Sequence, residues 1–405
     1  MKAVQFEVGA FTYVMLKALG GLNRRIFFGP LSGLRYREMP EPALPGDDWV
    51  KVRTIYGGIC GSDLNMVFLH DSPSASPFAS MPFVVGHENM GVITEVGPAV
   101  KGFAAGDRVV ADPVLSCAAR GFVEPCDSCR RGEYSTCTNF NKGRIEPGMS
   151  IGLCKSTGGS WGEYFVAHRS QLVRVPDHVT DEYAALIDPL ASALHPVMRH
   201  FPKDTDRVLV VGAGIIGLLV VACLRALGSK AHITLMARYQ FQADMAKKLG
   251  ADTVVMSRGD YYTKLAEVCG GELLKPILGK RIVQGGFDMV YDCVGSDVTL
   301  DDSLRFTAPG GKMVLVGLAS LPKGVDWTPI WLKELSVVGV VYYSVEQYQG
   351  EQVRTYELAM RLIAEGKLNL EGMLTHTFPI SEYQKALLVA SDKREFQSVK
   401  VAFKF

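Results

Sequence analysis

The sequence has almost no net charge, no internal repeat and no low-complexity tract. Its 405 residues carry 43 Lys and Arg against 42 Asp and Glu, a net charge of +1. A balance this even gives no electrostatic reason to bind nucleic acid or an anionic membrane surface. We therefore expect neither a nucleic-acid partner nor a membrane partner.

We also expect neither a targeting segment nor a membrane span. Glu7 stands where a signal peptide would be apolar. The most hydrophobic stretch, residues 208–224, is nearly long enough to cross a bilayer, but it contains three glycines and meets Arg225. A buried strand, a tight turn and a helix explain this stretch better than a membrane span.

Cysteine is present, but not in the pattern of a disulfide framework. The nine cysteines are an odd number, and four of them fall between Cys117 and Cys137. A secreted disulfide scaffold would be shorter, with paired cysteines. We expect a reducing, cytoplasmic compartment in which the thiols bind metal or are buried.

The length, with 48% hydrophobic and 21% charged residues, indicates a globular chain of two domains. Short strands separated by Gly and Pro are expected in the first third, at residues 49–56, 91–96, 107–111, 162–167 and 172–175. This density of turns is typical of a β-rich, barrel-like domain. A mixed apolar and basic segment, Phe11 to Phe28, interrupts it and could form a helix.

From Asp188 onward, apolar strands alternate with helical patterns, which indicates a doubly wound parallel sheet. The expected strands are 207–211, 233–236, 254–256, 289–293, 312–316 and 336–341, and the first helices are 215–227 and 241–249. A later helix, 353–365, and strand, 398–403, could return to the first domain. The expected fold is thus α/β, with a β-rich domain at 1–187 joined by 343–405, and a dinucleotide-binding domain at 188–342.

A glycine-rich turn carries the strongest single signal for a cofactor. Gly212-x-Gly214-x-x-Gly217 directly follows an apolar strand, and Ile215 and Ile216 open an apolar helix. The glycines permit a tight turn and let a pyrophosphate approach the backbone at the helix N-terminus. A glycine-rich packing turn is the weaker alternative.

The end of the second expected strand bears on the choice of cofactor. NAD calls for a carboxylate there to bind the ribose 2′-hydroxyl. The sequence instead has small Ala237 followed by Arg238, which leaves room for a 2′-phosphate and supplies a cation to bind it. The pattern favours NADP(H) over NAD(H). The alternative is that Arg238 is a solvated residue beside an NAD site.

Two short motifs upstream supply the residue types that zinc prefers. Cys60 lies in Gly-Ile-Cys-Gly-Ser-Asp, and His87 and Glu88 follow Gly86. Cys and His are preferred zinc ligands, and a nearby carboxylate can ligate the metal or orient the imidazole. Either motif alone would be unremarkable, but together and upstream of a nucleotide fold they indicate a catalytic zinc.

These motifs, in this order, resemble the zinc-containing medium-chain dehydrogenase/reductase (alcohol dehydrogenase) family, particularly sorbitol, threonine and glucose dehydrogenases. The resemblance also rests on the Met1-Lys-Ala-Val opening, Gly106-Asp-Arg-Val, Gly162-Glu-Tyr and Asp188-Pro-Leu. It implies a GroES-like catalytic domain, a Rossmann cofactor domain and an active-site zinc in the cleft between them. We expect a homodimer or homotetramer acting on a small alcohol or carbonyl substrate.

The resemblance also implies roles for individual residues. Cys60 and His87 match zinc ligands, and Glu88 matches a residue that ligates the metal or sits just behind it. Ser62 matches the hydroxyl that passes the alcohol proton outward, and Asp63 the acid that holds the histidine. Lys400 matches a basic residue that contacts the cofactor pyrophosphate.

The sequence departs from the family pattern at two positions. Asp188 stands where a Cys or Glu ligand is usual. Aspartate can bind zinc, but its side chain is shorter than that of glutamate and could reach the metal only through water, in which case Glu88 is the ligand. Glu88 and Asp188 are therefore both candidates for the third ligand. Asn65 replaces a relay histidine and cannot exchange a proton. Ser62 must then pass the proton to water, a ribose hydroxyl or another group such as His70.

A second metal site is expected in the cysteine-rich segment. Cys126, Cys129 and Cys137 follow the spacing C-x2-C-x7-C, and Val123 occupies the position of the family's first cysteine. We expect Cys117 to fill that vertex and complete a closed, structural zinc site. The alternative is a segment that has lost its metal and kept leftover thiols.

The whole pattern predicts a zinc-dependent oxidoreductase that moves a hydride between NAD(P) and an alcohol or polyol, or the matching aldehyde or ketone. One alternative is a zinc-free quinone or enone reductase of the same fold, which would have no reason to keep Cys60, His87 and Glu88 together. Another is a non-catalytic NADP(H)-binding sensor, which would not need Ser62.

Overall fold

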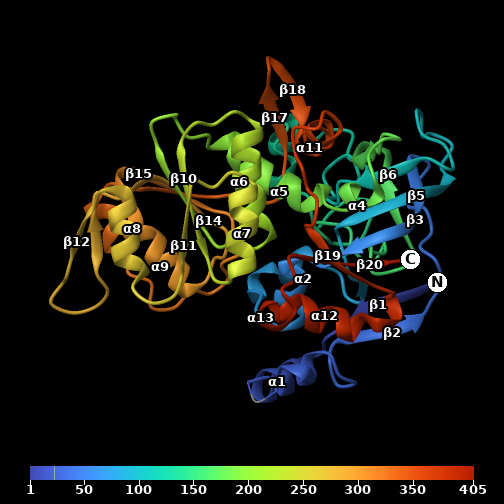
Figure 1. The fold of residues 1–405 in the computed structure, drawn as a ribbon. Helices are drawn as coiled ribbons and strands as arrows, with labels where there is room; N and C mark the ends of the chain where they lie inside the picture. Colours follow the sequence, from blue (N-terminus) through green and yellow to red (C-terminus); the bar gives the residue numbers. More distant parts are fainter. Residues whose placement is uncertain (22) are drawn as a thin grey trace. The chain divides into compact units, whose positions relative to one another are not determined.

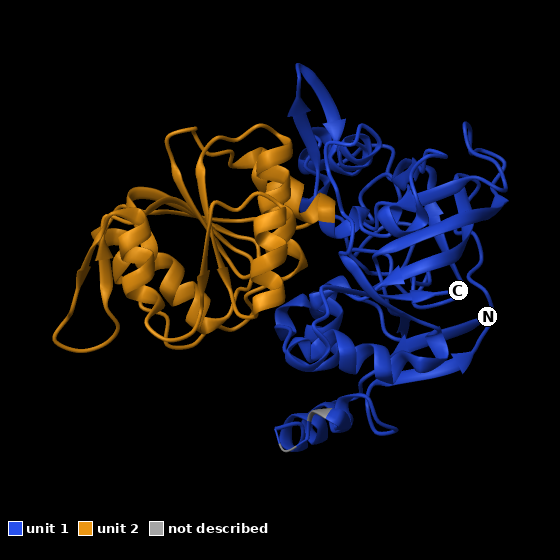
Figure 2. Ribbon diagram, in the orientation of Figure 1, with its two compact units in different colours: residues 1–189, 343–405 blue, residues 190–342 orange. Residues whose placement is uncertain are grey.

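The computed structural model describes residues 1–21 and 23–405, which form two compact units (Figure 2). Unit 1 comprises Met1–Pro189 and Tyr343–Phe405, and unit 2 comprises Leu190–Tyr342. None of the helices within the described residues combines the length and the apolar character that a membrane crossing requires.

Unit 2 is built on a six-stranded sheet with the order β11–β10–β9–β14–β15–β16 (Figure 1). All five pairings are parallel. The order matches the doubly wound dinucleotide-binding arrangement. In it the second and third strands lie on one side of the first strand, and the fourth to sixth strands lie on the other side. The expected parallel sheet is confirmed. Its strands are β9 (Arg207–Val211), β10 (His232–Ala237), β11 (Thr253–Met256), β14 (Phe287–Asp292), β15 (Thr307–Leu315) and β16 (Ser336–Gly339).

Helices lie on both sides of this sheet (Figure 1). The central helix α6 (Ile215–Ala226) buries every residue from Gly217 to Leu224, so it is apolar almost all round. The other elements of unit 2 are α7 (Gln240–Lys248), α8 (Tyr261–Cys269), the hairpin β12 (Glu272–Leu274) and β13 (Ile282–Gln284), α9 (Asp297–Phe306) and α10 (Thr328–Leu332). Helix α5 (Ile187–Arg199) contains the boundary between the two units.

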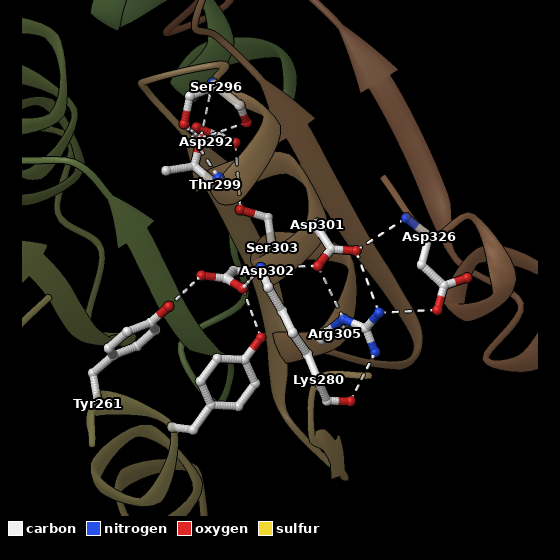
Figure 3. Close-up of polar contacts among 11 residues, drawn as sticks. Tyr261, Lys280, Asp292, Ser296, Thr299, Asp301, Asp302, Ser303, Arg305 and Asp326 are labelled. Atoms are coloured by element: carbon white, nitrogen blue, oxygen red, sulfur yellow. Dashed lines mark hydrogen bonds and ion pairs between the residues drawn. The ribbon is translucent and has the colours of Figure 1, made fainter. Parts of the chain in front are cut away.

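Two buried carboxylates on α9, those of Asp301 and Asp302, have cations and hydrogen-bond donors as partners (Figure 3). Lys280 Nζ lies 2.9 Å from Asp301 and 2.8 Å from Asp302. Arg305 pairs with Asp301 at 3.3 Å, and Asp302 accepts hydrogen bonds of 2.7 and 2.6 Å from the phenols of Tyr261 and Tyr262. Because each charge has a partner, this network is structural and joins the segment after β12 to α9.

Unit 1 contains a seven-stranded sheet and a three-stranded sheet. The C-terminal strand β20 pairs antiparallel with β3, with Ala402 opposite Gly58. Residues near the C-terminus therefore complete a sheet begun in the first third of the chain. The larger sheet comprises β19 (Leu374–Phe378), β20 (Lys400–Lys404), β3 (Trp49–Gly58), β5 (Asn89–Val96), β6 (Arg108–Ala111), β8 (Leu172–Arg174) and β7 (Tyr164–His168), and the smaller one β2 (Leu34–Glu38), β1 (Lys2–Phe6) and β4 (Phe83–Val84).

The segment expected as a helix from Phe11 to Phe28 is broken into two pieces. Helix α1 covers Ala10–Leu19, and a 3-10 turn covers Arg24–Phe27. Gly20 and Gly21 end the helix because glycine is a poor helix former, and Leu22 lies outside the described residues. The remaining elements of unit 1 are α2 (Gly61–Val67), α3 (Asp127–Arg130), α4 (Asp181–Ala184), the hairpin β17 (Val345–Tyr348) and β18 (Glu351–Arg354), α11 (Thr355–Ala364), α12 (Tyr383–Ser391) and α13 (Lys393–Phe396).

Candidate active site

Three potential metal ligands converge in unit 1. One ligand atom each from Cys60, His87 and Glu88 lie within 4.8 Å of one another. Cys60 is the N-cap of α2, while His87 and Glu88 lie between β4 and β5. His87 and Glu88 are buried. The sequence motifs that suggested a metal centre therefore meet at one point.

Asp63 organises this cluster from the first turn of α2. Its Oδ2 accepts a 2.8 Å hydrogen bond from the Cys60 backbone N–H, and its Oδ1 lies 3.4 Å from His87 Nδ1. Burial would lower the pKa of His87, but the Asp63 carboxylate and, after it, the Cys60 thiol outweigh burial and hold the pKa well above the usual value. With Nδ1 held by Asp63, Nε2 remains the ring nitrogen free to act as a ligand.

Glu88 is paired with Lys400, which the sequence assigns to the cofactor pyrophosphate. Lys400 Nζ contacts both carboxylate oxygens of Glu88 and donates a 3.0 Å hydrogen bond to the Ile59 carbonyl. Lys400 is only 2% exposed. Burial raises the pKa of Glu88, and the ammonium of Lys400 opposes that rise. The structure thus places Lys400 against Glu88.

The close packing around Glu88 explains a glycine in the first motif. A Cβ on Gly58 would lie 1.9 Å from Glu88 Oε2. Only glycine at this position leaves room for the carboxylate beside Cys60.

Asp188 lies outside the cluster of three ligands and is hydrogen-bonded to two tyrosines. Its Oδ2 accepts hydrogen bonds of 2.6 Å from the Tyr343 hydroxyl and 2.9 Å from the Tyr356 hydroxyl. Burial, reinforced by the Asp188 charge, raises the pKa of both phenols, so both remain protonated donors. The described residues contain two clusters of potential metal ligands, and Asp188 belongs to neither.

The expected relay hydroxyl lies in α2, next to Asp63. Ser62 is half-buried, and its hydroxyl forms no hydrogen bond within the described part of the chain. Asn65, one turn further along α2, accepts a 2.7 Å hydrogen bond at its carbonyl from His70 N–H. His70, at the end of this segment, has an exposed side chain. The structure therefore keeps Ser62 available to a ligand beside Cys60.

The four cysteines of the second motif form the other cluster. One sulfur from each of Cys117, Cys126, Cys129 and Cys137 lies within 4.8 Å of the others, and none is in a disulfide. Cys117 Sγ is 3.6 Å and Cys126 Sγ 3.9 Å from Cys137 Sγ. Hydrogen bonds from the neighbouring thiols, that of Cys129 first, lower the pKa of Cys137 to about 5. Val123, the position of the family's first cysteine, is 93% exposed.

The cysteine-rich segment is hydrogen-bonded to the strand that follows Tyr343. Ser135 Oγ lies 2.9 Å from Ser344 Oγ, and Val345 N–H donates a 3.0 Å bond to the Gly132 carbonyl. Ser344 directly follows the tyrosine that binds Asp188. The four-sulfur cluster and Asp188 therefore share one supporting element.

The glycine motif in unit 2 has the geometry of a dinucleotide loop. Gly212 has φ +98°, which L residues rarely adopt, and a Cβ on Gly217 would lie 1.8 Å from the Gly212 carbonyl oxygen. Gly214 is the N-cap of α6, and Ile215 and Ile216 form its first turn. The loop follows β9, next to β14, at the point where the strand order reverses. Free backbone N–H groups there can bind an anion.

Two arginines at the ends of neighbouring strands lie over the same aromatic ring. Ala237 ends β10 and is fully buried, while Arg238 is exposed. The guanidinium carbons of Arg238 and Arg258 lie 5.7 and 5.6 Å from the centre of the Tyr239 ring. Arg258 follows β11, and neither arginine pairs with a carboxylate among the residues described.

Comparison with known proteins agrees with this arrangement. Residues 46–177 match the family described as "Alcohol dehydrogenase GroES-like domain", and residues 216–364 match "Zinc-binding dehydrogenase". The chain therefore belongs to the zinc-binding, medium-chain alcohol dehydrogenase family, and the GroES-like and Rossmann domain types expected from the sequence are confirmed. It is an oxidoreductase that uses zinc and NAD(P) on an alcohol or the matching carbonyl compound.

Individual relatives are similar over nearly their full length. L-idonate 5-dehydrogenase from Vitis vinifera is 30% identical over 92% of this chain and 93% of that protein. Sorbitol dehydrogenase from Arabidopsis thaliana is 30% identical over 87% of this chain and 88% of that protein. A zinc-binding dehydrogenase from Sinorhizobium meliloti 1021, solved bound to NADP, has a TM-score of 0.71 and 27% identity, covering 92% of this chain and 95% of that one.

Four residues at these sites were not indicated by the sequence in the roles that the structure gives them: Lys400, Tyr343, Tyr356 and Arg258. For Arg258 a signal existed, because it follows the strand beside β10, and the carboxyl ends of parallel strands meet at one edge. The tyrosines carried no such signal, since they lie more than 150 residues from Asp188.

Proposed function

We propose that this chain oxidises a secondary alcohol of a polyol, or reduces the matching ketone, with a catalytic zinc at Cys60, His87 and Glu88 and with NADP(H) preferred. The observation that carries the proposal is the convergence of those three ligand atoms beside the Ser62 hydroxyl. The polyol class is supported by the relatives named for idonate and sorbitol.

The donor set fits a catalytic zinc. One thiolate, one imidazole and one carboxylate leave one position of a tetrahedral site open, as catalytic zinc requires. Bound zinc supplies Lewis-acid chemistry, which lowers the pKa of a coordinated alcohol. Asp63 fixes His87, and Ser62 takes the alcohol proton and passes it outward.

Glu88, and not Asp188, is proposed as the third ligand. The supporting observation is that both tyrosine hydroxyls occupy the same oxygen of Asp188, while Glu88 lies within the cluster. Lys400 then acts as a positioning residue, because its ammonium holds the Glu88 carboxylate beside Cys60.

The four-cysteine cluster is proposed as a structural zinc site. A tetrahedron with zinc–sulfur bonds of about 2.3 Å has edges of about 3.8 Å. The sulfur separations of 3.6 and 3.9 Å fall on either side of this length. Four thiolates leave no open position, so this metal would stabilise the segment and take no part in the reaction.

The NADP preference is supported by two cations where an NAD site would carry an acid. Arg238 and Arg258, which both lie over the Tyr239 ring, would bind the 2′-phosphate. The Gly212–Gly217 loop would bind the pyrophosphate at the start of α6.

We also propose that the chain forms a homodimer or homotetramer. Strand β16 ends the parallel sheet of unit 2 and exposes Val337. Nearby in the sequence, Trp331 and Leu332 are 70% and 57% exposed. An edge strand flanked by exposed aromatic and aliphatic residues is typical of a surface that pairs with another copy.

The experiment that tests the function is a substrate and cofactor panel. Purified zinc-loaded protein would be assayed with polyols, aliphatic alcohols and aromatic alcohols, using NAD and NADP, and followed by nicotinamide absorbance. The proposal predicts the highest kcat/KM for a polyol with NADP. Turnover of enones or quinones without zinc, and no turnover of alcohols, would contradict it.

A further inference from the structure

The excursion between β1 and β2, residues 7–33, takes no part in the sites described above. It is nevertheless a folded part of unit 1. Leu16, Phe27 and Phe28 are buried. The rings of Phe27 and Phe28 lie 5.4 and 5.5 Å from that of Phe68. In addition, Gln384 donates a 2.6 Å hydrogen bond to the Phe28 carbonyl. These contacts fix the base of α1 against the rest of the unit.

Helix α1 turns a large apolar surface away from those contacts. Phe11 is 82% exposed and Val14 is 66% exposed, whereas Leu16 is 1% exposed. At 100° per residue, Phe11, Val14 and Ala18 form one stripe of the helix, and Leu16 points to the opposite side. The helix therefore buries one apolar side in unit 1 and presents a second one outward.

The same excursion, together with the strand β2 that follows it, carries a local positive charge that the whole-chain balance conceals. Residues 7–38 contain five basic residues and two acidic ones, Glu7 and Glu38 at the two ends of the segment, although the chain as a whole has a net charge of +1. Four of the basic side chains are exposed, and none of the four pairs with a carboxylate in the described ranges 1–21 and 23–405: Lys17, Arg25, Arg35 and Arg37. Lys17 lies on α1 itself, beside the apolar stripe.

We propose that α1 rests on an anionic lipid bilayer, with Phe11 and Val14 inserted at the acyl boundary and Lys17 and Arg25 on the lipid phosphates. An apolar stripe flanked by unpaired cations is the signature of a helix that lies in a membrane interface. The apolar and the electrostatic contribution are both needed for stable, reversible attachment. The enzyme would thus act at the membrane surface, and this attachment is independent of zinc and cofactor.

The charge argues against a second copy of the chain as the occupant of this surface. In a two-fold symmetric contact the same patch meets itself. Lys17 and Arg25 would then face their own counterparts, with no acid in residues 8–37 to compensate them. Like charges placed opposite one another disfavour such a contact.

The test is co-sedimentation of the full chain with vesicles. We expect binding to vesicles of equal parts phosphatidylcholine and phosphatidylglycerol, and little binding to phosphatidylcholine alone. Lys17→Glu with Arg25→Glu, and separately Phe11→Glu with Val14→Glu, should each lower the binding constant by about tenfold or more. Lys247→Glu with Lys248→Glu, the same charge change on exposed residues of α7, should bind like the parent protein.

Three results would overturn the proposal. The first is absence of binding to the anionic vesicles, and the second is equal binding to both kinds of vesicle. The third is light scattering in which the parent protein is a dimer and the Phe11→Glu, Val14→Glu variant is a monomer, which would assign the surface to a second copy. Turnover should be unchanged in both α1 variants, which separates this proposal from the catalytic one and also shows that the variants are folded.

Discussion

The hydroxyl of Tyr343 donates a 2.6 Å hydrogen bond to Oδ2 of Asp188, in a part of unit 1 where both side chains are buried. Tyr356 binds the same oxygen, and its ring lies edge-on to that of Tyr343 with centroids 4.8 Å apart. These two hydrogen bonds distinguish Asp188 from Glu88, the two carboxylates that the sequence left as alternatives for the third zinc ligand. For this reason we propose Glu88 as the ligand.

We predict that Glu88→Gln loses the catalytic zinc on dialysis and that Asp188→Asn retains it. Glu88→Gln removes a ligand and leaves only Cys60 and His87. Asp188→Asn changes a group that does not bind the metal itself, and such a change costs about 10–100-fold in metal affinity or activity. Metal analysis of both variants checks this. A zinc-free Asp188→Asn protein beside a fully loaded Glu88→Gln protein would reverse the assignment.

A cobalt-substituted protein gives a readout that does not depend on turnover. Tyr343→Phe with Tyr356→Phe frees the Asp188 carboxylate from both donors. The freed Asp188 carboxylate should then approach the metal. We therefore expect the visible absorption of the bound cobalt to change in this variant. Phe replaces each ring without its hydroxyl, so the packing is retained.

The four-cysteine cluster should contribute to stability and not to the chemical step. We predict that Cys129→Ala releases one zinc and lowers the Tm by about 5 °C or more, with little change in kcat at low temperature. Ser128→Ala, a neighbour in α3 whose side chain is not a ligand, is the matched control. A variant with an unchanged Tm but greatly reduced kcat would argue against a structural role.

Cofactor preference should respond to the end of β10. Ala237→Asp with Arg238→Leu should shift kcat/KM towards NAD by one to two orders of magnitude. A charge-assisted hydrogen bond is worth about 1.5–3 kcal/mol, and about 1.4 kcal/mol is tenfold. Arg258→Leu should weaken NADP and leave NAD unchanged, whereas Lys247→Leu, an exposed residue of α7, should alter neither. A parent enzyme that already prefers NAD by about tenfold would disprove this account.

One pH dependence follows from a buried lysine in unit 2. Lys333 donates 2.8 Å hydrogen bonds to the carbonyls of Val283, Arg305 and Thr307, and burial lowers its pKa from 10.5 to about 8. In the window from about 8 to 10.5 Lys333 keeps its proton in the unfolded chain and loses it in the folded one, so this side chain contributes stability that grows as the pH increases. Buried tyrosines and cysteines with raised pKa values contribute with the opposite sign, so the Lys333 contribution is measured as a difference between two proteins. Between pH 8 and 10.5, the stability of Lys333→Met relative to the parent protein in denaturant unfolding should fall as the pH increases.

The parallel sheet of unit 2 could be predicted because its signals are local. Each strand is a short apolar run, and Gly212 to Gly217 mark the turn into α6. The cysteine spacing likewise placed Cys126, Cys129 and Cys137 in one cluster, because they are close in the chain.

The contacts that the sequence did not reveal join residues far apart along the chain. Tyr343 reaches Asp188 and Lys400 reaches Glu88 only because the C-terminal segment returns to unit 1 and β20 pairs with β3. The family resemblance implies a pyrophosphate contact for Lys400. Its contact with Glu88 depends on the pairing of β20 with β3, which the sequence does not indicate. No local sequence pattern indicates contacts between residues that lie so far apart along the chain.

We propose above all that Cys60, His87 and Glu88 hold the zinc that activates the substrate. The Cys60→Ser variant tests this when zinc, NADP binding and alcohol turnover are measured in one preparation. We expect zinc to fall from two ions per chain to one and turnover to be abolished, with NADP binding and the fold retained. Full activity in a Cys60→Ser protein that contains a single zinc would contradict it.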